Sequence, residues 1–544
     1  MRPIAARIAV ADAAAGGAVG RAARIRPRRP KANSVTAYYL TTAIDYANGD
    51  PHLGHAFEKI GADVIARYHR MRGDDVWFLI GMDEHGQKVA QTAADRGLTP
   101  QALVDEVAAT FQAMWRRLDI SNDQFIRTTE PAHKNGVQAL IERIFEKSPS
   151  DFYEKSYEGH YCVGCEAFKQ ENEVVDGRCV LHPTRVLEWV EERNWFFRLS
   201  KYADFLKSHF EAHPDFLQPS SRRNEILSLI NQGLDDVSAS RARLAWGVPF
   251  PRPTSDGEVQ TTYVWFDALP NYLTATGFPN AEPRQQWPAQ LHVIGKDITR
   301  FHSVIWPAML EAAGLPLPER IWAHGFVNLG GERFSKSAGV KLELGEAIDR
   351  FGADSFRFFL MREIPFDTDG NFSWERFEER YTSDLANGFG NLASRTIAMI
   401  EKYRGGVVPT VVRNDAYAAD ARDITAYAEA MDGHMLHLAL EAVFRNVDSG
   451  NEYVTSQAPW KLAKDPALAT ALDETLATLA RKLAIQTVLL APYMPRKAQS
   501  LWEQLGGPGI VSDQRFASLD SLDPSGWTMT KGAPLFPRDG PPAA

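Results

Sequence analysis

The stretch Val35-Thr36-Ala37-Tyr38-Tyr39-Leu40-Thr41-Thr42 is rich in β-branched and aromatic residues, as a buried strand is. It leads into a turn at Asn48-Gly49-Asp50-Pro51, and His52 then opens a helical stretch that reaches about Arg72. A second strand is predicted at Val76-Trp77-Phe78-Leu79-Ile80. This alternation of strand, helix and strand predicts a parallel α/β nucleotide-binding unit.

The alternation breaks between residues 150 and 260, where cysteines, aromatic residues and short polar turns replace it. Strand-like segments resume at 262–266 and 291–295, so we expect the α/β domain to be split by an inserted module. From Phe377 to Leu505 helical spacing of apolar residues dominates, which predicts a C-terminal helical bundle. The expected ranges are 36–150 and 260–325 for the α/β halves, 151–259 for the insertion, 386–537 for the bundle and 538–544 for a fraying tail.

The chain has 544 residues, of which 44% are hydrophobic and 24% charged, and its formal net charge is −9. At about 100–200 residues per domain, this length predicts three or four domains of a folded, soluble protein. The charge gives no global reason to bind nucleic acid, although a local basic face would be enough. We find no stretch of about 18 uncharged apolar residues, and therefore expect no membrane span.

Residues 1–34 hold eight basic residues and a single acid, Asp12, among many alanines and glycines. We favour a disordered or untranslated leader, with an organelle transit peptide as the alternative. The three cysteines are clustered and odd in number, which is a poor disulfide framework and favours a reducing compartment.

The tetrapeptide His52-Leu53-Gly54-His55 stands at the start of the first predicted helix. A helix N-terminus offers unpaired N–H groups and positive potential to a phosphate, and a glycine lets a nucleotide approach the backbone. The two histidines are then placed to donate to phosphate oxygens as charge develops. Taken alone, the tetrapeptide is explained equally well as a structural cap or a chance match.

A second candidate lies far downstream, at Arg333-Phe334-Ser335-Lys336-Ser337-Ala338-Gly339, after Gly330-Gly331. A lysine flanked by serines in a movable loop can reach a triphosphate and withdraw afterwards. The alternative is a solvated turn, which the order of the two segments disfavours. Together the two segments predict a split ATP site.

This pair resembles the two signatures of the class I aminoacyl-tRNA synthetases, HIGH and KMSKS in one-letter code, which stand here as HLGH and RFSKS. Arg333 and Phe334 depart from the second signature, whereas the lysine credited with phosphate contact is kept as Lys336. The resemblance implies a Rossmann-like catalytic domain with a connective insertion. It also implies a region at 326–385 that holds the KMSKS loop and contacts the tRNA stem.

Further segments, between about Thr36 and about Pro537, resemble the methionyl-tRNA synthetase family. They are Tyr46-Ala47-Asn48-Gly49, Gly81-Met82-Asp83-Glu84-His85-Gly86, Tyr263-Val264-Trp265-Phe266-Asp267-Ala268 and Ile294-Gly295-Lys296-Asp297-Ile298, with Phe301, His302, Ser303 and Trp306. Aromatic walls suit the polarizable sulfur of methionine, and Trp306 is a candidate wall. The positions that the resemblance implies for methionine are Ile44, Tyr46, Asp83, Trp265, Ala268, Tyr272, Ile298 and His302, with Arg241 as a further candidate.

The implied reaction has two steps. The methionine carboxylate attacks the α-phosphorus of ATP, held with Mg²⁺, and the terminal hydroxyl of tRNA then takes the methionyl group. His52, His55 and Lys336 are the expected catalytic residues, acting through positioning and charge stabilisation. The positions implied for ATP are His52, Gly54, His55, Gly295, Asp297, Ser335, Lys336 and Ser337. Two alternatives stay open: a small-molecule nucleotidyltransferase, and an RNA-binding paralogue with an inactive site.

Cys162-Val163-Gly164-Cys165 is followed, after thirteen residues, by Cys179-Val180-Leu181-His182. Both pairs have the spacing of zinc knuckles, and three thiolates with one imidazole suit a closed tetrahedral Zn²⁺ site. The alternative is free thiols beside an unrelated histidine. We expect one structural Zn²⁺, held by Cys162, Cys165, Cys179 and His182.

Asn391 and Arg395 lie four residues apart on one face of a predicted bundle helix, and Trp460 follows Gln457-Ala458-Pro459. Asn and Arg read base edges, and unpaired bases stack on aromatic rings. The resemblance implies that these three residues bind the anticodon of tRNA(Met), initiator tRNA included. No oligonucleotide-binding barrel follows the bundle, so we expect a monomer. We expect no membrane partner and a bacterial cytoplasmic location, with organelle import as the alternative.

Overall fold

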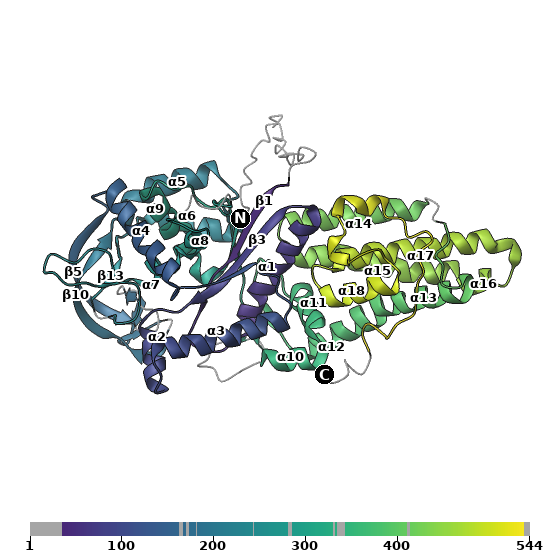
Figure 1. Cartoon of the computed structure of the whole chain (residues 1–544), viewed down its shortest axis with the longest axis horizontal. Coiled ribbons are helices and arrows are strands. Elements are labelled where there is room, and N and C mark those ends of the chain that lie inside the picture. The colour runs from purple at the N-terminus through teal and green to yellow at the C-terminus, as the bar shows by residue number, and fades with distance from the viewer. Residues whose placement is uncertain are drawn as a thin grey trace, which may run out of the picture. The chain divides into compact units, whose positions relative to one another are not determined.

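The computed structural model describes residues 35–162, 167–169, 173–180, 182–242, 244–280, 286–329, 332–333, 343–410 and 414–537. From Thr36 onward the chain forms one compact unit, whose elements are labelled in Figure 1. The leader predicted at 1–34 and the tail predicted at 538–544 lie outside the described residues.

Seven strands of the described chain form the central sheet, which is built around β1 (Ala37–Thr42). β1 pairs in parallel with β3 (Asp75–Asp83) on one side and with β15 (Leu291–Gly295) on the other. β16 (Ile321–His324) extends the sheet beyond β15, and β4 (Gln124–Arg127) extends it beyond β3. Because these strands are parallel, their carboxyl ends meet at one edge, and the predicted parallel α/β unit is confirmed.

The helix predicted from His52 is α1 (Leu53–Arg72), which packs on β1 and β3. Gly73 ends it at a φ of 97°, a left-handed conformation in which a Cβ would be strained. Ahead of α1, the short strand β2 (Asp45–Tyr46) pairs with β3, so that Asp45 lies opposite Met82. Since successive residues of a strand point to opposite faces, the Asp45 and Tyr46 side chains point to opposite sides of the sheet.

A long antiparallel pair of strands dominates residues 151–259. Its strands are β5 (Phe152–Cys162) and β10 (Glu188–Phe197), paired along most of their length. Within the same range, β11 (Leu217–Gln218) instead pairs in parallel with β16 of the central sheet. The segment predicted as an insertion therefore also contributes a strand to the catalytic sheet.

The prediction of a strand at 262–266 is wrong. Only Thr261–Thr262 is extended, as β14, and α7 (Val264–Ala268) follows at once. The N–H groups of Phe266 and Asp267 donate to the Tyr263 carbonyl, which starts the helical turn. A run of five apolar and aromatic residues fits either state, and here tertiary packing decides.

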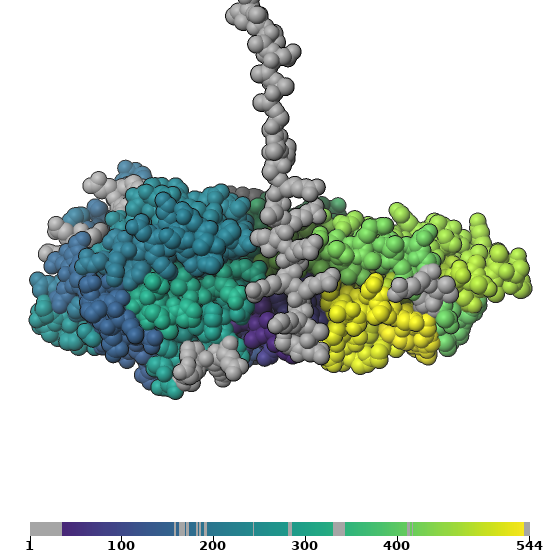
Figure 2. Space-filling view, turned by 90° about the horizontal axis from the view of Figure 1, so that it is seen from above, coloured from purple at the N-terminus to yellow at the C-terminus, as the bar shows by residue number. Residues whose placement is uncertain are grey.

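The C-terminal helical bundle is confirmed. Its main helices are α13 (Gly390–Arg404), α14 (Asp415–Asp432), α15 (Leu436–Gln457), α17 (Ala469–Leu490) and α18 (Pro495–Gln504). They appear from green to yellow in Figures 1 and 2. In the part of the chain that the structure describes, no helix is long and apolar enough to cross a membrane.

Arg357, on α11 (Ala353–Glu363), ties the bundle to the catalytic sheet. Its fully buried guanidinium donates to the Asp63 carboxylate on α1 at 2.6 Å. It also donates to the carbonyl of Leu118, which follows α3 (Pro100–Arg117), at 3.0 Å. Two further bonds reach the carbonyls of Pro492 and Tyr493, between α17 and α18, at 2.8 and 3.0 Å. One cation thus holds three segments that are distant in sequence.

Candidate active site

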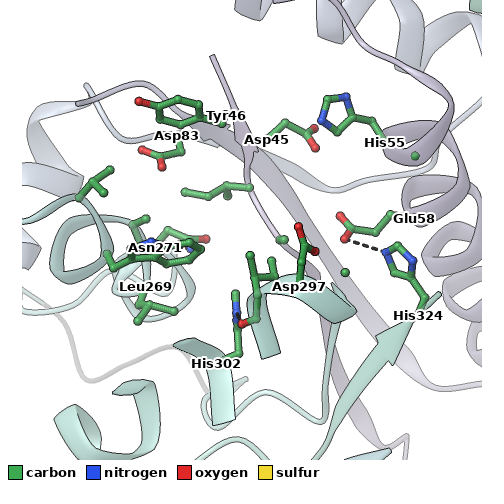
Figure 3. Close-up of a pocket in the computed structure, with 18 of the residues that line it drawn as sticks. Asp45, Tyr46, His55, Glu58, Asp83, Leu269, Asn271, Asp297, His302 and His324 are labelled. Atoms are coloured by element: carbon green, nitrogen blue, oxygen red, sulfur yellow. Dashed lines mark hydrogen bonds and ion pairs between the residues drawn. The ribbon is translucent and has the colours of Figure 1, made fainter. Parts of the chain in front are cut away.

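A cavity of about 450 Å³ opens at the carboxyl edge of the central sheet, beside the N-terminus of α1. Ligands of open α/β sheets bind at this edge. Figure 3 shows the lining side chains converging from β2, β3, α1 and the segments after β15 and β16. All eight residues predicted for methionine line it, and so do five predicted for ATP: His52, Gly54, His55, Gly295 and Asp297.

The two histidines of the first signature cap α1 reciprocally. The Gly54 N–H donates to Nδ1 of His52 at 3.1 Å, and the His52 N–H donates to Nδ1 of His55 at 3.2 Å. Their rings stack with centroids 3.6 Å apart. Because both Nδ1 atoms accept, the neutral rings hold their protons on Nε2, as donors. The signature is therefore a structural cap that also fixes the tautomers of both histidines.

Gly54 packs closely against the His52 ring in this cap. A Cβ at this position would lie 3.1 Å from Cε1 of His52, closer than ordinary van der Waals contact. With a larger residue here, the His52 ring would have to shift by a few tenths of an ångström. The absence of a side chain also opens the cavity toward the first turn of α1, which suits a bound phosphate.

Aromatic rings and an imidazole form the other half of the cavity. Trp265 stacks on Phe301 with centroids 3.8 Å apart. The Nδ1–H of His302 donates to the Ile298 carbonyl at 3.1 Å, so its Nε2 accepts from the Tyr272 hydroxyl at 2.7 Å. Burial lowers the pKa of His302 to about 4, which keeps the ring neutral. This half is mostly apolar; its charged lining residues are Asp83 and Lys88, whose Nζ lies 5.9 Å from the Tyr46 ring centroid.

Two predicted neighbours of the substrate do not line the cavity. Trp306 is completely buried behind Tyr272, with ring centroids 6.3 Å apart, and supports that wall from outside. Arg241 is also buried and lies over the Tyr263 ring, 4.1 Å from its centroid. Arg333 is described only in its backbone, as part of β18 (Glu332–Arg333). Ser335, Lys336 and Ser337 lie outside the described residues.

Sequence reasoning missed a buried network of charges at the cavity. Lys59 is completely buried and donates to Asp45 at 2.8 Å, to Glu58 at 2.8 Å and to the Ala43 carbonyl at 3.0 Å. The second oxygen of Glu58 lies 3.1 Å from Nε2 of His324. Two signals in the sequence could have found these residues. Glu58 follows His55 by three residues, which puts both on one face of α1, and His324 ends an apolar strand at the carboxyl edge of the sheet.

The charges of this network depend on its buried contacts. Nδ1 of His324 lies 2.8 Å from the Gly325 carbonyl and its Nε2 faces Glu58, so both ring nitrogens lie against oxygen atoms. Burial alone would raise the pKa of Glu58, but the charge of Lys59 and the bond from His324 lower it. Burial would likewise lower the pKa of Lys59, and Asp45 and Glu58 raise it instead.

A second buried network fixes α7 against the loop after β3. Asp267 accepts from His85 at 2.7 Å and from His133 at 3.0 Å. His133 also bonds the Thr274 hydroxyl at 2.8 Å. Burial would raise the pKa of Asp267, but the two histidines hold it at about 2. Asp267 lies between the lining residues Trp265 and Ala268, and His85 lies two residues after Asp83. The network therefore connects the α7 side of the apolar half to the β3 side.

Two of the predicted zinc ligands are described. Cys162, at the end of β5, and Cys179, in β8 (Arg178–Cys179), are both buried and belong to one small cluster with Leu187. The backbone of Cys179 pairs with the backbone of His182 across a tight turn, so the two residues of this knuckle are neighbours. Cys165 and the His182 side chain lie outside the described residues, and within those described no group of three or more metal-binding side chains is found.

The predicted anticodon residues lie on the bundle. Asn391 and Arg395 are partly buried and four residues apart on α13. Trp460 lies on the short helix α16 (Pro459–Leu462) and is 40% exposed, unusual for a tryptophan. An exposed indole is available for stacking.

A parallel sheet with a His-Leu-Gly-His cap at its carboxyl edge and a helical bundle behind it defines a class I aminoacyl-tRNA synthetase. A family model described as "tRNA synthetases class I (M)" matches residues 38–186 and 170–397. The chain is 45% identical over 529 residues to a methionine–tRNA ligase of Streptomyces coelicolor, covering 92% of this chain and 96% of that protein. The chain belongs to the methionyl-tRNA synthetase family.

Two further relatives agree with this. A methionine–tRNA ligase of Rhizobium meliloti is 45% identical over 523 residues, covering 93% of this chain and 99% of that protein. The solved structure of the Mycobacterium tuberculosis methionyl-tRNA synthetase in complex with methionyl-adenylate superposes with a TM-score of 0.86 at 41% identity. It covers 92% of this chain and 100% of that one.

Proposed function

We propose that this chain activates L-methionine with ATP to methionyl-adenylate and then transfers the methionyl group to tRNA(Met). The observation that supports this most directly is the single cavity in which a donor-bearing helix cap faces an apolar pocket with one carboxylate. A close relative has been solved with methionyl-adenylate bound. Methionine-dependent exchange of pyrophosphate into ATP, followed by charging of purified tRNA, tests the two steps separately.

The apolar half is proposed to hold methionine. Trp265, backed by Phe301, gives a flat wall for the thioether, and Asp83 is the counter-ion for the ammonium group. The neutral His302 and its partner Tyr272 close the end of the pocket without adding charge. Homocysteine lacks one methyl group, a difference of only about 1–3 kcal/mol, and is the competitor to test.

The helix cap is proposed to hold the phosphates of ATP. The Nε2–H groups of His52 and His55 and the first turn of α1 stabilise charge as the α-phosphorus is attacked. The methionine carboxylate is already a nucleophile, so no protein base is required. The new O–P bond forms as the bond to pyrophosphate breaks. Gly295 and Asp297 are proposed to hold the adenosine, and Ser335, Lys336 and Ser337 to contact the triphosphate. When bound, Mg²⁺ would neutralise phosphate charge.

Trp460 is proposed to stack on a base of the anticodon, beside Asn391 and Arg395. Replacing Trp460 with alanine should lower kcat/KM for tRNA about 10- to 100-fold, since stacking on one base is worth about 1–3 kcal/mol. ATP–pyrophosphate exchange should not change. Leu468→Ala is the matched control, because Leu468 is equally exposed and lies in the same part of the bundle but has no ring. Equal losses for the two variants would argue against stacking.

Cys162, Cys165, Cys179 and His182 are proposed to bind one structural Zn²⁺. The shared burial of Cys162 and Cys179 supports this. We expect metal analysis to find one zinc per chain, and chelation to increase proteolysis within 151–259 while exchange activity persists. A Cys162→Ser variant that kept its zinc and its fold but lost exchange would show that the knuckle has a catalytic role instead.

The remaining assignments are also proposals. The catalytic halves are assigned to 36–150 and 260–325, the connective module to 151–259, the KMSKS-loop region to 326–385 and the anticodon-binding bundle to 386–537. We also propose that the protein is a monomer and is located in the cytoplasm. Sedimentation of the purified chain tests whether it is a monomer.

A further inference from the structure

Asp45 is a lining residue of the cavity that no step of the proposed reaction uses. Its carboxylate is 4% exposed. Oδ1 accepts from Lys59 at 2.8 Å, whereas Oδ2 is buried and has no hydrogen-bond partner among the described residues. A buried carboxylate oxygen without a donor is costly, so a ligand group is expected to meet it.

The position of Asp45 identifies which half of the ligand it meets. Tyr46, its neighbour in β2, and Asp83, opposite Tyr46 in β3, belong to the methionine half. Asp45 points to the other face of the sheet, toward α1 and Lys59. Figure 3 shows its carboxylate turned toward His55 and away from Asp83. The group nearest Oδ2 in a bound complex is therefore the phosphate chain at the helix cap.

The charges around Asp45 make its ionised form unsuited to a polyanion. With Asp45 ionised, two carboxylates, Asp45 and Glu58, share the single ammonium group of Lys59. With Asp45 protonated, the network carries one negative charge fewer beside an incoming phosphate. The other charged or titratable groups that line the cavity are His52, His55, Asp83, Lys88, Asp297 and His302.

We propose that Asp45 binds ATP as a carboxylic acid: it takes up one proton from solvent as the triphosphate enters, and its Oδ2–H donates to a phosphate oxygen. The inference rests on the proposed function, because it needs ATP at the helix cap. Lys59 is the positioning residue, since its bonds to Oδ1 and to the Ala43 carbonyl leave only Oδ2 toward the cavity.

The cost of this proton is small near neutral pH. Burial, opposed by the charge of Lys59, raises the pKa of Asp45 to about 7 in the free protein. A phosphate beside it raises that pKa further. Binding is therefore favoured below the free pKa and weakens as the pH rises above it, by about tenfold per pH unit while the acid must be re-formed.

Calorimetry of ATP binding without methionine, at saturating Mg²⁺, tests the proposal. Titrations at pH 8 in buffers of different ionisation enthalpy give the number of protons taken up. We expect the wild-type protein to take up about 0.9 proton more than Asp45→Asn, since a group of pKa about 7 is mostly ionised at pH 8. Protons that ATP itself binds contribute equally to both proteins, so they cancel when the Asp45→Asn value is subtracted from the wild-type value. Asp45→Asn should bind with an affinity that does not fall between pH 7 and 9.

Asp83→Asn is the matched control, because it neutralises a carboxylate on the methionine side and should keep the proton uptake. If Asp45→Asn fails to fold, the number of protons that the wild-type protein takes up on binding ATP is compared with the number taken up on binding adenosine. Only ATP should cause proton uptake. Equal uptake in wild type and Asp45→Asn, or loss of ATP binding by a folded Asp45→Asn, overturns the proposal. Failure of the wild-type protein to bind ATP would instead overturn the proposed function.

Discussion

Replacing Lys336 with alanine is expected to slow methionyl-adenylate formation by about 10²- to 10³-fold, the usual effect of removing one charge-stabilising donor. Lys336 is the only lysine of the RFSKS segment, so no neighbouring lysine replaces its charge. Equilibrium binding of methionine should hardly change, because the methionine half of the cavity is built from β2, β3, α7 and the segment after β15. Single-turnover adenylate formation and a methionine titration measure the two effects separately.

Arg333→Lys is the control for this experiment. It restores the lysine of the family signature at the position where this chain has arginine, so adenylate formation should stay within a few-fold of wild type. Comparable losses of adenylate formation and methionine binding in Lys336→Ala would show that the loop acts only in building the pocket.

Replacing Arg357 with methionine is expected to lower the free energy of unfolding by about 3–5 kcal/mol, the range for one partner of a buried ion pair. Methionine fills a similar volume but leaves three buried carbonyls without a donor and removes one of the two arginines that pair with Asp63, which keeps Arg67. Urea unfolding followed by circular dichroism measures the loss.

The exposed pair Arg96–Glu106 supplies the matched control. Both side chains are about half exposed, and Arg96→Met should change stability by less than about 1 kcal/mol. An Arg357→Met variant as stable as wild type would mean that Arg357 does not hold the bundle to α1.

The sequence predicts those parts of the molecule in which local pattern and tertiary packing agree. The apolar run at 37–42 and the helix after His52 are such cases, and so is the position of the cavity at the carboxyl edge of the sheet. All eight residues that the family resemblance implies for methionine line that cavity.

What escaped prediction depends on partners that are distant in sequence. Val264-Trp265-Phe266 lies in a helix whose Asp267 is bound by His85 and His133, far upstream. Lysine is usually a surface residue, and only the approach of two carboxylates makes the complete burial of Lys59 tolerable. No local pattern predicts such a group.

The pairing of β1 with β15 has a consequence for synthesis of the chain. Thr41 and His292 face each other across this pair although 251 residues separate them. On the ribosome, β1, α1, β3 and β4 emerge early, and one edge of β1 stays unpaired until β15 has been translated. An open, apolar strand edge of this kind invites pairing with other chains. Slow folding and a need for chaperones during translation are expected of this topology, since its central strand waits for a distant partner.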